Sequence, residues 1–175
     1  MNKRQLAGTA MAVLMAASLS ACNPPAPAKA SVDTDKIADA VKADTAQRIA
    51  DINAHDTAKF VGHNAADAVS MFHGRPNAVG TTAIEAGLKQ TLANSPDLHV
   101  TLSDQTVDVA ASGDMAVSRS TTVATFTDTK TNKPVTTTNN SLVGYKPQAD
   151  GSWKIEWSVV SDVGPPPAAA PATKG

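Results

Sequence analysis

The sequence predicts an α+β domain in which helices pack on one face of a curved, mostly antiparallel sheet. Apolar residues recur at helical spacing in the segments before Pro96 and alternate with polar residues after it. Turn-forming clusters at 112–114, 129–134 and 147–152 divide the alternating part into consecutive strands. Helices followed by a run of short-looped strands are typical of this fold class.

The first predicted helix spans residues 35–54, and Asp33 or Thr34 is placed to cap its start. The sequence NAHD at 53–56 interrupts the helical pattern, and Asp56 can cap a second helix over 57–64. The inward positions of the first helix are Ile37, Val41, Thr45, Arg48 or Ile49, and Ile52.

A short strand is predicted over 66–73, followed by a loop over 74–80 that is rich in turn-forming residues. Thr82 and Glu85 have the spacing of a capping box, in which each side chain bonds the other residue's backbone, and this predicts the start of a third helix. Its apolar stripe comprises Ile84, Leu88 and Leu92.

Four strands follow. In the first, the alternation that starts at Leu98 slips in phase near Asp104, which predicts a β-bulge. The other three span residues 115–128, 135–146 and 153–162. The alternation of the last strand predicts a single apolar face that contains Trp153, Ile155, Trp157 and Val159.

Residues 1–21 have the pattern of a secretory signal peptide, because Lys3 and Arg4 are followed by an uncharged, mainly apolar run. As a helix this run would be about 24 Å long, which is too short to span a membrane. The run ends in Leu19-Ser20-Ala21-Cys22, which resembles the lipobox of bacterial lipoproteins. This resemblance implies cleavage before Cys22 and lipidation of Cys22, the only cysteine. The alternative is an ordinary signal peptide with an incidental thiol.

Beyond the signal peptide, residues 22–33 are expected to form a Pro/Ala-rich tether, residues 34–163 the domain, and residues 164–175 a disordered tail. The residue after the cysteine is Asn23 and not an aspartate. In enteric-type bacteria, the sorting of lipoproteins would then imply an outer-membrane location facing the periplasm. Without residues 1–21 the chain has 13 basic and 16 acidic residues and no basic run, which makes nucleic-acid binding improbable.

Five short motifs along the domain resemble the nuclear-transport-factor-2-like superfamily, and within it the SnoaL-like, ketosteroid-isomerase-like branch. The motifs are NAHD, ADAV, G-TTAI, SGDMAV and DGSWKI, which occur in this order between Asp35 and Asp162. The resemblance implies a cone-shaped fold in which three helices pack on a strongly curved sheet. It also implies a pocket at the open end of the cone and homodimers that form through the sheet.

The isomerases of this family use a carboxylate base, a tyrosine and a protonated aspartic acid. The resemblance places Phe72 at the position of the base, Arg48 near that of the tyrosine and Asn140 near that of the aspartic acid. Because phenylalanine cannot accept a proton, we expect steroid-isomerase catalysis to be absent, unless the neighbouring His73 replaces the base.

Three further residues are candidates for the pocket. Arg119 could bind an anionic ligand if it points inward, or form a surface salt bridge if it points outward. Asn140 could bind a ligand carbonyl or be solvated, and Trp157 could line the pocket or belong to the core. Of the other histidines, His55 is interpreted as a solvated turn residue, His63 as a surface or helix-end residue and His99 as an edge residue. Their spacing gives no support for a metal site, and no cofactor is expected.

The sequence therefore predicts a lipid-anchored envelope protein whose domain binds a small apolar molecule, with Arg48, Phe72, His73, Arg119, Asn140 and Trp157 as candidate ligand contacts. An alternative is an isomerase, cyclase or hydratase that uses His73 as its base. A third possibility is a structural partner in an envelope complex. The absence of the carboxylate base favours the first and third of these functions.

Overall fold

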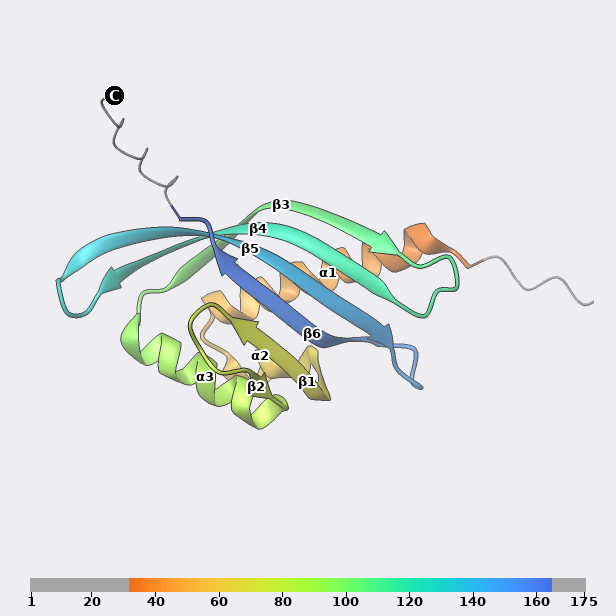
Figure 1. Cartoon of the computed structure of the whole chain (residues 1–175), viewed down its shortest axis with the longest axis horizontal. Coiled ribbons are helices and arrows are strands. Elements are labelled where there is room, and N and C mark those ends of the chain that lie inside the picture. The colour runs from red at the N-terminus through yellow and green to blue at the C-terminus, as the bar shows by residue number, and fades with distance from the viewer. Residues whose placement is uncertain (1–31, 165–175) are drawn as a thin grey trace, which may run out of the picture. The chain divides into compact units, whose positions relative to one another are not determined.

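A computed structural model describes residues 32–164, which fold into three helices and a six-stranded sheet (Figure 1). The predicted signal peptide, Cys22, most of the predicted tether and the predicted tail from residue 165 lie outside the described residues. The elements are α1 (Thr34–Asn53), α2 (Thr57–Gly62), β1 (Asn64–Phe72), β2 (Ala78–Val79), α3 (Thr81–Asn94), β3 (His99–Val109), β4 (Ala116–Asp128), β5 (Lys133–Pro147) and β6 (Trp153–Asp162).

The strands are ordered β2-β1-β6-β5-β4-β3 in one curved sheet, and the three helices cover one of its faces (Figure 1). Only β1 and β6 pair in parallel, while the other four pairs are antiparallel. The predicted α+β fold, with helices on one face of a curved and mostly antiparallel sheet, is confirmed. None of the described helices is long and apolar enough to cross a membrane.

Two hydrophobic clusters lie between the helices and the sheet. The first joins Val41 of α1 to Tyr145 and Ile155 on the sheet, all three almost completely buried. The second joins Phe60 of α2 to Ile84 of α3 over β1. Both clusters lie in the part of the chain from Ser31, which separates from residues 1–30 as a compact unit and therefore has its own core.

The first two helices begin at the predicted caps. The Asp33 carboxylate accepts a hydrogen bond from the Lys36 amide (3.0 Å), and Asp56 accepts one from the Lys59 amide (2.9 Å). Residue 64, predicted as the end of the second helix, instead begins β1, and β2 occupies part of the predicted 74–80 loop.

The predicted capping box at Thr82 and Glu85 is wrong. The residue before α3 is Gly80, with φ of 81°, and no side chain caps the helix. Glu85 is occupied elsewhere, because its carboxylate accepts a hydrogen bond from the Thr57 hydroxyl (3.0 Å) and pairs with Lys89 (2.8 Å). It therefore joins α2 to α3 instead of returning to its own helix start.

Two β-bulges decide which side chains face the helices. The register of β3 shifts between Leu102 and Asp104, which confirms the predicted bulge. A second shift pairs Tyr145 with Ile155 but Gly144 with Trp157, so that Glu156 is an extra residue in β6.

This second bulge moves Trp157 and Val159 to the outer face of the sheet, away from Ile155. The predicted single apolar face of the last strand is therefore wrong. The Trp157 ring packs directly on Gly144, where even a Cβ atom would overlap the indole. Trp157 thus stabilises the outer surface of β5 and β6, and it does not line the space beneath the sheet.

Candidate functional site

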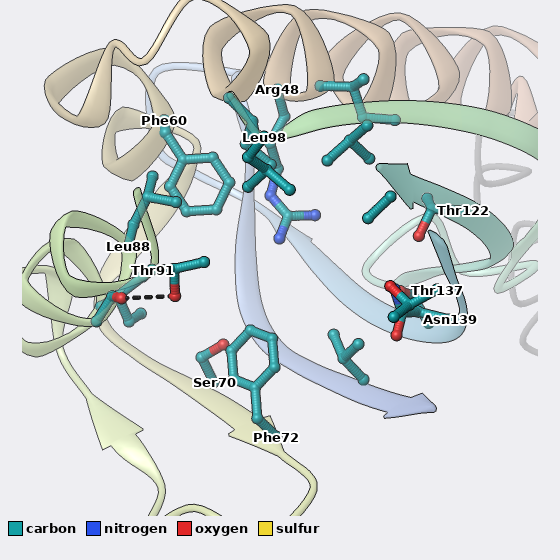
Figure 2. Close-up of a pocket in the computed structure, with 18 of the residues that line it drawn as sticks. Arg48, Phe60, Ser70, Phe72, Leu88, Thr91, Leu98, Thr122, Thr137 and Asn139 are labelled. Atoms are coloured by element: carbon teal, nitrogen blue, oxygen red, sulfur yellow. Dashed lines mark hydrogen bonds between the residues drawn. The ribbon is translucent and has the colours of Figure 1, made fainter. Parts of the chain in front are cut away.

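A cavity of about 640 Å³ lies between the helices and the inner face of the sheet. Side chains from α1, α2 and α3 line one side, and side chains from β1 and β3–β6 line the other (Figure 2). The lining surface is mainly apolar, although about half of the lining residues carry hydroxyl, amide or charged groups. This volume and lining are those of a typical small-molecule site.

The cavity has a buried end and an exposed end. Thr45, Ser70 and Ala124 line it and are almost fully buried, whereas Phe72, which also lines it, is 43% exposed. At the exposed end the Arg75 guanidinium lies over the Phe72 ring, 5.8 Å from its centroid. Ligands would therefore enter past Phe72 and Arg75.

Arg48 is the charged side chain that α1 places inside the cavity. Its guanidinium lies 4.8 Å from the centre of the Phe60 ring and projects toward the strands (Figure 2). The Nε atom is completely buried and has no hydrogen-bond partner. Burial lowers the pKa of Arg48, although Tyr145 and Asp44 nearby favour its charged form.

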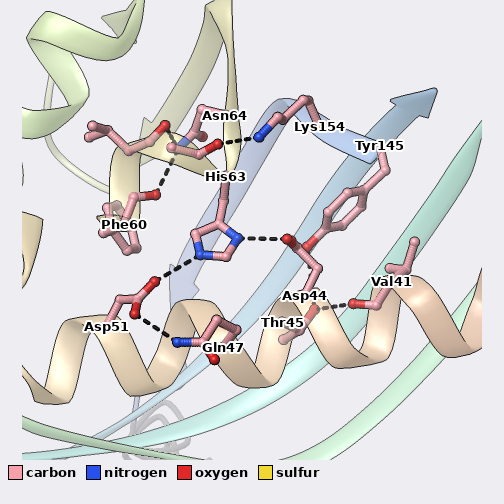
Figure 3. A network of polar contacts seen from close by, with 12 residues as sticks. Val41, Asp44, Thr45, Gln47, Asp51, Phe60, His63, Asn64, Tyr145 and Lys154 are labelled. Atoms are coloured by element: carbon pink, nitrogen blue, oxygen red, sulfur yellow. Dashed lines mark hydrogen bonds and ion pairs between the residues drawn. The ribbon is translucent and has the colours of Figure 1, made fainter. Parts of the chain in front are cut away.

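His63, at the end of α2, binds two carboxylates of α1 (Figure 3). Its Nδ1 lies 2.6 Å from Asp44 Oδ1, and its Nε2 lies 2.9 Å from Asp51 Oδ2. The hydrogen bond with Asp44 is the largest cause of a raised His63 pKa, which burial partly opposes. Burial alone would raise the pKa of Asp51, but hydrogen bonds from His63 and Gln47 outweigh it and lower that pKa.

Tyr145, the only tyrosine, is fully buried next to the inner end of the cavity. Its hydroxyl lies 3.3 Å from Thr45 Oγ1, which also accepts a hydrogen bond from Gln105 (2.9 Å). Gln105 donates a further hydrogen bond to Ser118 (3.0 Å). Burial is the main cause that raises the pKa of Tyr145 to about 12, so the phenol is neutral at physiological pH.

The six predicted contact residues fall into separate places. Arg48 and Phe72 line the cavity, as the resemblance implied. His73 follows β1 in an exposed turn and does not line it. Arg119, Asn140 and Trp157 are on the outer face of the sheet, so the inward orientation considered for them is wrong.

Arg119 and Asn140 do come together, but in a shallow hollow of about 330 Å³ on the outer face. Arg119 forms an exposed ion pair with Asp108 (3.0 Å), and Asn140 accepts a hydrogen bond from Thr121 (3.1 Å). Leu142 is exposed in the same hollow. The predicted homodimer through the sheet would use this face, and it stays a prediction.

The lining limits the chemistry that the cavity can perform. Asp162, at the exposed end, is the only carboxylate among the described residues that line it, and no histidine does. Within residues 32–164 no group of three histidine, cysteine or acidic side chains could hold a metal ion. The arrangement can enclose an apolar molecule and present to it several hydroxyl groups, the Arg48 guanidinium inside and the Arg75 guanidinium at the entrance.

The curved sheet and the three helices packed on it give this chain the α+β fold of NTF2-like proteins. More specifically, the chain belongs to the SnoaL-like domain family, whose sequence profile matches residues 46–152. The resemblance inferred from the five motifs is thereby confirmed for the domain. No curated protein matches the chain.

Solved structures support the same class. A ketosteroid isomerase-like protein from Erwinia carotovora atroseptica is 23% identical, with a TM-score of 0.65 over 75% of this chain and 99% of that one. The protein Aln2 from a Streptomyces species is 16% identical, with a TM-score of 0.63 over 75% and 92%. An NTF2-like protein with a cystatin-like fold from Novosphingobium aromaticivorans is 17% identical, with a TM-score of 0.60 over 78% and 84%. At these identities the likeness establishes the fold.

Proposed function

We propose that this chain is a lipid-anchored protein of the bacterial envelope whose SnoaL-like domain binds a small, mainly apolar molecule. The observation that carries the proposal is the cavity of about 640 Å³, whose lining surface is mainly apolar and which reaches solvent past Phe72. A cavity that served only as structural packing would be filled by side chains, because protein interiors are packed densely.

Binding is favoured over catalysis by the lining residues. Phe72 occupies the position where the family resemblance implies the base, and the neighbouring His73 is exposed in the turn beyond β1. Asp162 is exposed at the entrance, far along β6 from the buried Ser158. An enzyme of the isomerase type needs a proton acceptor in contact with its substrate.

The anchor rests on the sequence Leu19-Ser20-Ala21-Cys22 and on the tether that follows it. A lipidated Cys22 would hold the domain at the membrane on a proline-rich segment. In a bacterial expression host, the wild-type chain should fractionate with the outer membrane and the Cys22→Ser variant should not. Equal membrane association of both chains would exclude the lipid anchor.

The binding function is tested by filling the cavity. Thr137 lines it from β5, whereas its neighbour Thr136 is exposed on the opposite face. Thr137→Trp should weaken binding of the neutral fluorophore N-phenyl-1-naphthylamine by roughly tenfold or more, a loss of about 1.4 kcal/mol. Thr136→Trp should leave binding unchanged.

The measurement is an equilibrium fluorescence titration of the chain from Ser31, with thermal unfolding to show that both variants are folded. Native mass spectrometry of the same preparation would show whether a molecule from the host is retained. If the wild-type chain binds no fluorophore, or if the two tryptophan variants weaken binding equally, the cavity is not a binding site.

A further inference from the structure

The Arg48 guanidinium has no hydrogen-bond acceptor among residues 32–164. It belongs to none of the ion pairs formed among residues 32–164, and its fully buried Nε has no hydrogen-bond partner. The group contacts the Phe60 ring and faces the open space of the cavity (Figure 2). A guanidinium has five N–H donors, so a site that buries it is incomplete without an acceptor.

The two carboxylates closest to Arg48 along α1 both bind His63, although Asp44 Oδ2 is buried without a hydrogen-bond partner. Asp44 and Asp51 are four residues before and three residues after Arg48, on the same face of the helix. Both are bound by His63, through Nδ1 and Nε2 respectively (Figure 3). The fold thus uses its own anions to hold α2 and leaves the N–H groups of Arg48 available to a ligand.

The position of Arg48 also favours an anion. The guanidinium is in a largely apolar space, where the attraction between opposite charges is much stronger than in water. Its burial has an electrostatic cost that only a charged or strongly polar partner can offset. Arg75 is the other arginine that lines the cavity, but it is exposed at the entrance, where solvent screens such an interaction.

We propose that the ligand of this cavity is an amphipathic carboxylic acid that binds with its carboxylate toward the inner end. The carboxylate accepts hydrogen bonds from the Arg48 guanidinium, and the apolar body lies along Leu88, Leu98 and Val160 toward the entrance at Phe72. This inference rests on the proposed binding function and specifies the chemical class of the ligand.

The test compares an acid and an alcohol that share the same hydrocarbon chain. Dodecanoate and 1-dodecanol are titrated against N-phenyl-1-naphthylamine bound to the chain from Ser31. A charge-assisted hydrogen bond in this position should make dodecanoate the stronger competitor by roughly ten- to a hundredfold. The wild-type comparison needs no substitution, so it holds whether or not a variant folds.

Variants then identify the arginine responsible. Arg48→Met, which keeps an unbranched apolar stem without the charge, should abolish the preference by weakening the acid and strengthening the alcohol. Arg48→Lys should retain part of the preference, because it keeps the charge but not the planar donors. Arg119→Met is the matched control, since it removes an arginine from the outer face, and Arg75→Met tests the entrance.

Each result decides one question. Two results overturn the assignment of the carboxylate to Arg48. One is equal competition by the acid and the alcohol, and the other is a preference for the acid that survives in Arg48→Met but is lost in Arg75→Met. Both results leave the proposed binding function intact. If neither the fluorophore nor either competitor binds, the proposed function fails and this inference fails with it. Loss of the preference in Arg48→Met alone supports the inference.

Discussion

His63 is the residue outside the cavity lining whose replacement should destabilise the domain most clearly. Its ring joins α2 to two turns of α1, and its side chain is 12% exposed. The substitution His63→Gln keeps a polar side chain of similar size. A glutamine amide has one donor end and one acceptor end, so it can satisfy one carboxylate but faces the other with its oxygen.

The size of the effect follows from the two contacts. Each is a charge-assisted hydrogen bond, for which roughly 1.5–3 kcal/mol is usual. Asp51 is nearly buried at 6% side-chain exposure, while Asp44 at 21% is partly reached by solvent, which reduces its share. We expect His63→Gln to lower the free energy of unfolding by about 3 kcal/mol. For a domain of this size that corresponds to a melting temperature lower by about 12 °C.

The effect of His63 should depend on pH. Because the folded-state pKa of His63 is raised, folding favours its protonated form. The stabilisation is fully present below the ordinary histidine pKa of about 6.5 and is lost as the pH rises through the raised value. The wild-type chain should therefore lose stability as the pH rises above about 6.5, whereas His63→Gln should lack this decline.

The assay is urea unfolding of the chain from Ser31 at several pH values, followed by tryptophan fluorescence. His99→Gln is the matched control, because His99 is an exposed residue at the start of the edge strand β3. Two results would refute the reasoning. One is a pair of parallel stability profiles for the wild-type chain and His63→Gln. The other is a decrease in the free energy of unfolding of less than about 1 kcal/mol at pH 6, which is the size expected for an exposed ion pair.

Two further predictions concern buried residues. Gly144→Ala should destabilise the domain by about 1–3 kcal/mol, because the new methyl group overlaps the Trp157 ring. The same change at Gly87 on α3, where nothing opposes a Cβ, should be neutral or stabilising, and urea unfolding compares the two. Absorbance titration of Tyr145 should give a pKa of about 12 in the folded chain and about 10 in denaturant. A folded-state value near 10 would show that the phenol is accessible.

The sequence was most informative where a local pattern determines the structure. The two aspartate caps and the bulge near Asp104 can be read from a few neighbouring residues. The direction of Arg119 could not be read in this way. In β4, Val117 faces outward with Arg119, whereas the small residues Ala116 and Ala124 face inward. Because apolar residues occur on both faces of β4, their pattern does not show which face is buried.

The remaining errors have causes that are distant in the sequence. The bulge at Glu156 reverses the orientation of Trp157. The space for the Trp157 ring is left by Gly144, which is on another strand. Likewise, the partners of His63 are 12 and 19 residues away, on a helix that meets α2 only in the folded chain. His63 was interpreted as a surface or helix-end residue. It does end α2, but its side chain is only 12% exposed, and no local pattern indicates that it binds two carboxylates.

His63 and Arg48 are linked through the same face of α1. Asp44, Arg48 and Asp51 follow one another at helical spacing, an arrangement that in an isolated helix would pair Arg48 with a carboxylate on either side. The packing of α2 on α1 places His63 between the two carboxylates. His63 binds one oxygen of each, and it binds both best when its ring is protonated. The contact that fixes the two helices therefore also determines that the guanidinium faces the cavity with its donors unused. On this argument, the stability of the domain and the charge presented to a ligand depend on one histidine that does not itself line the cavity.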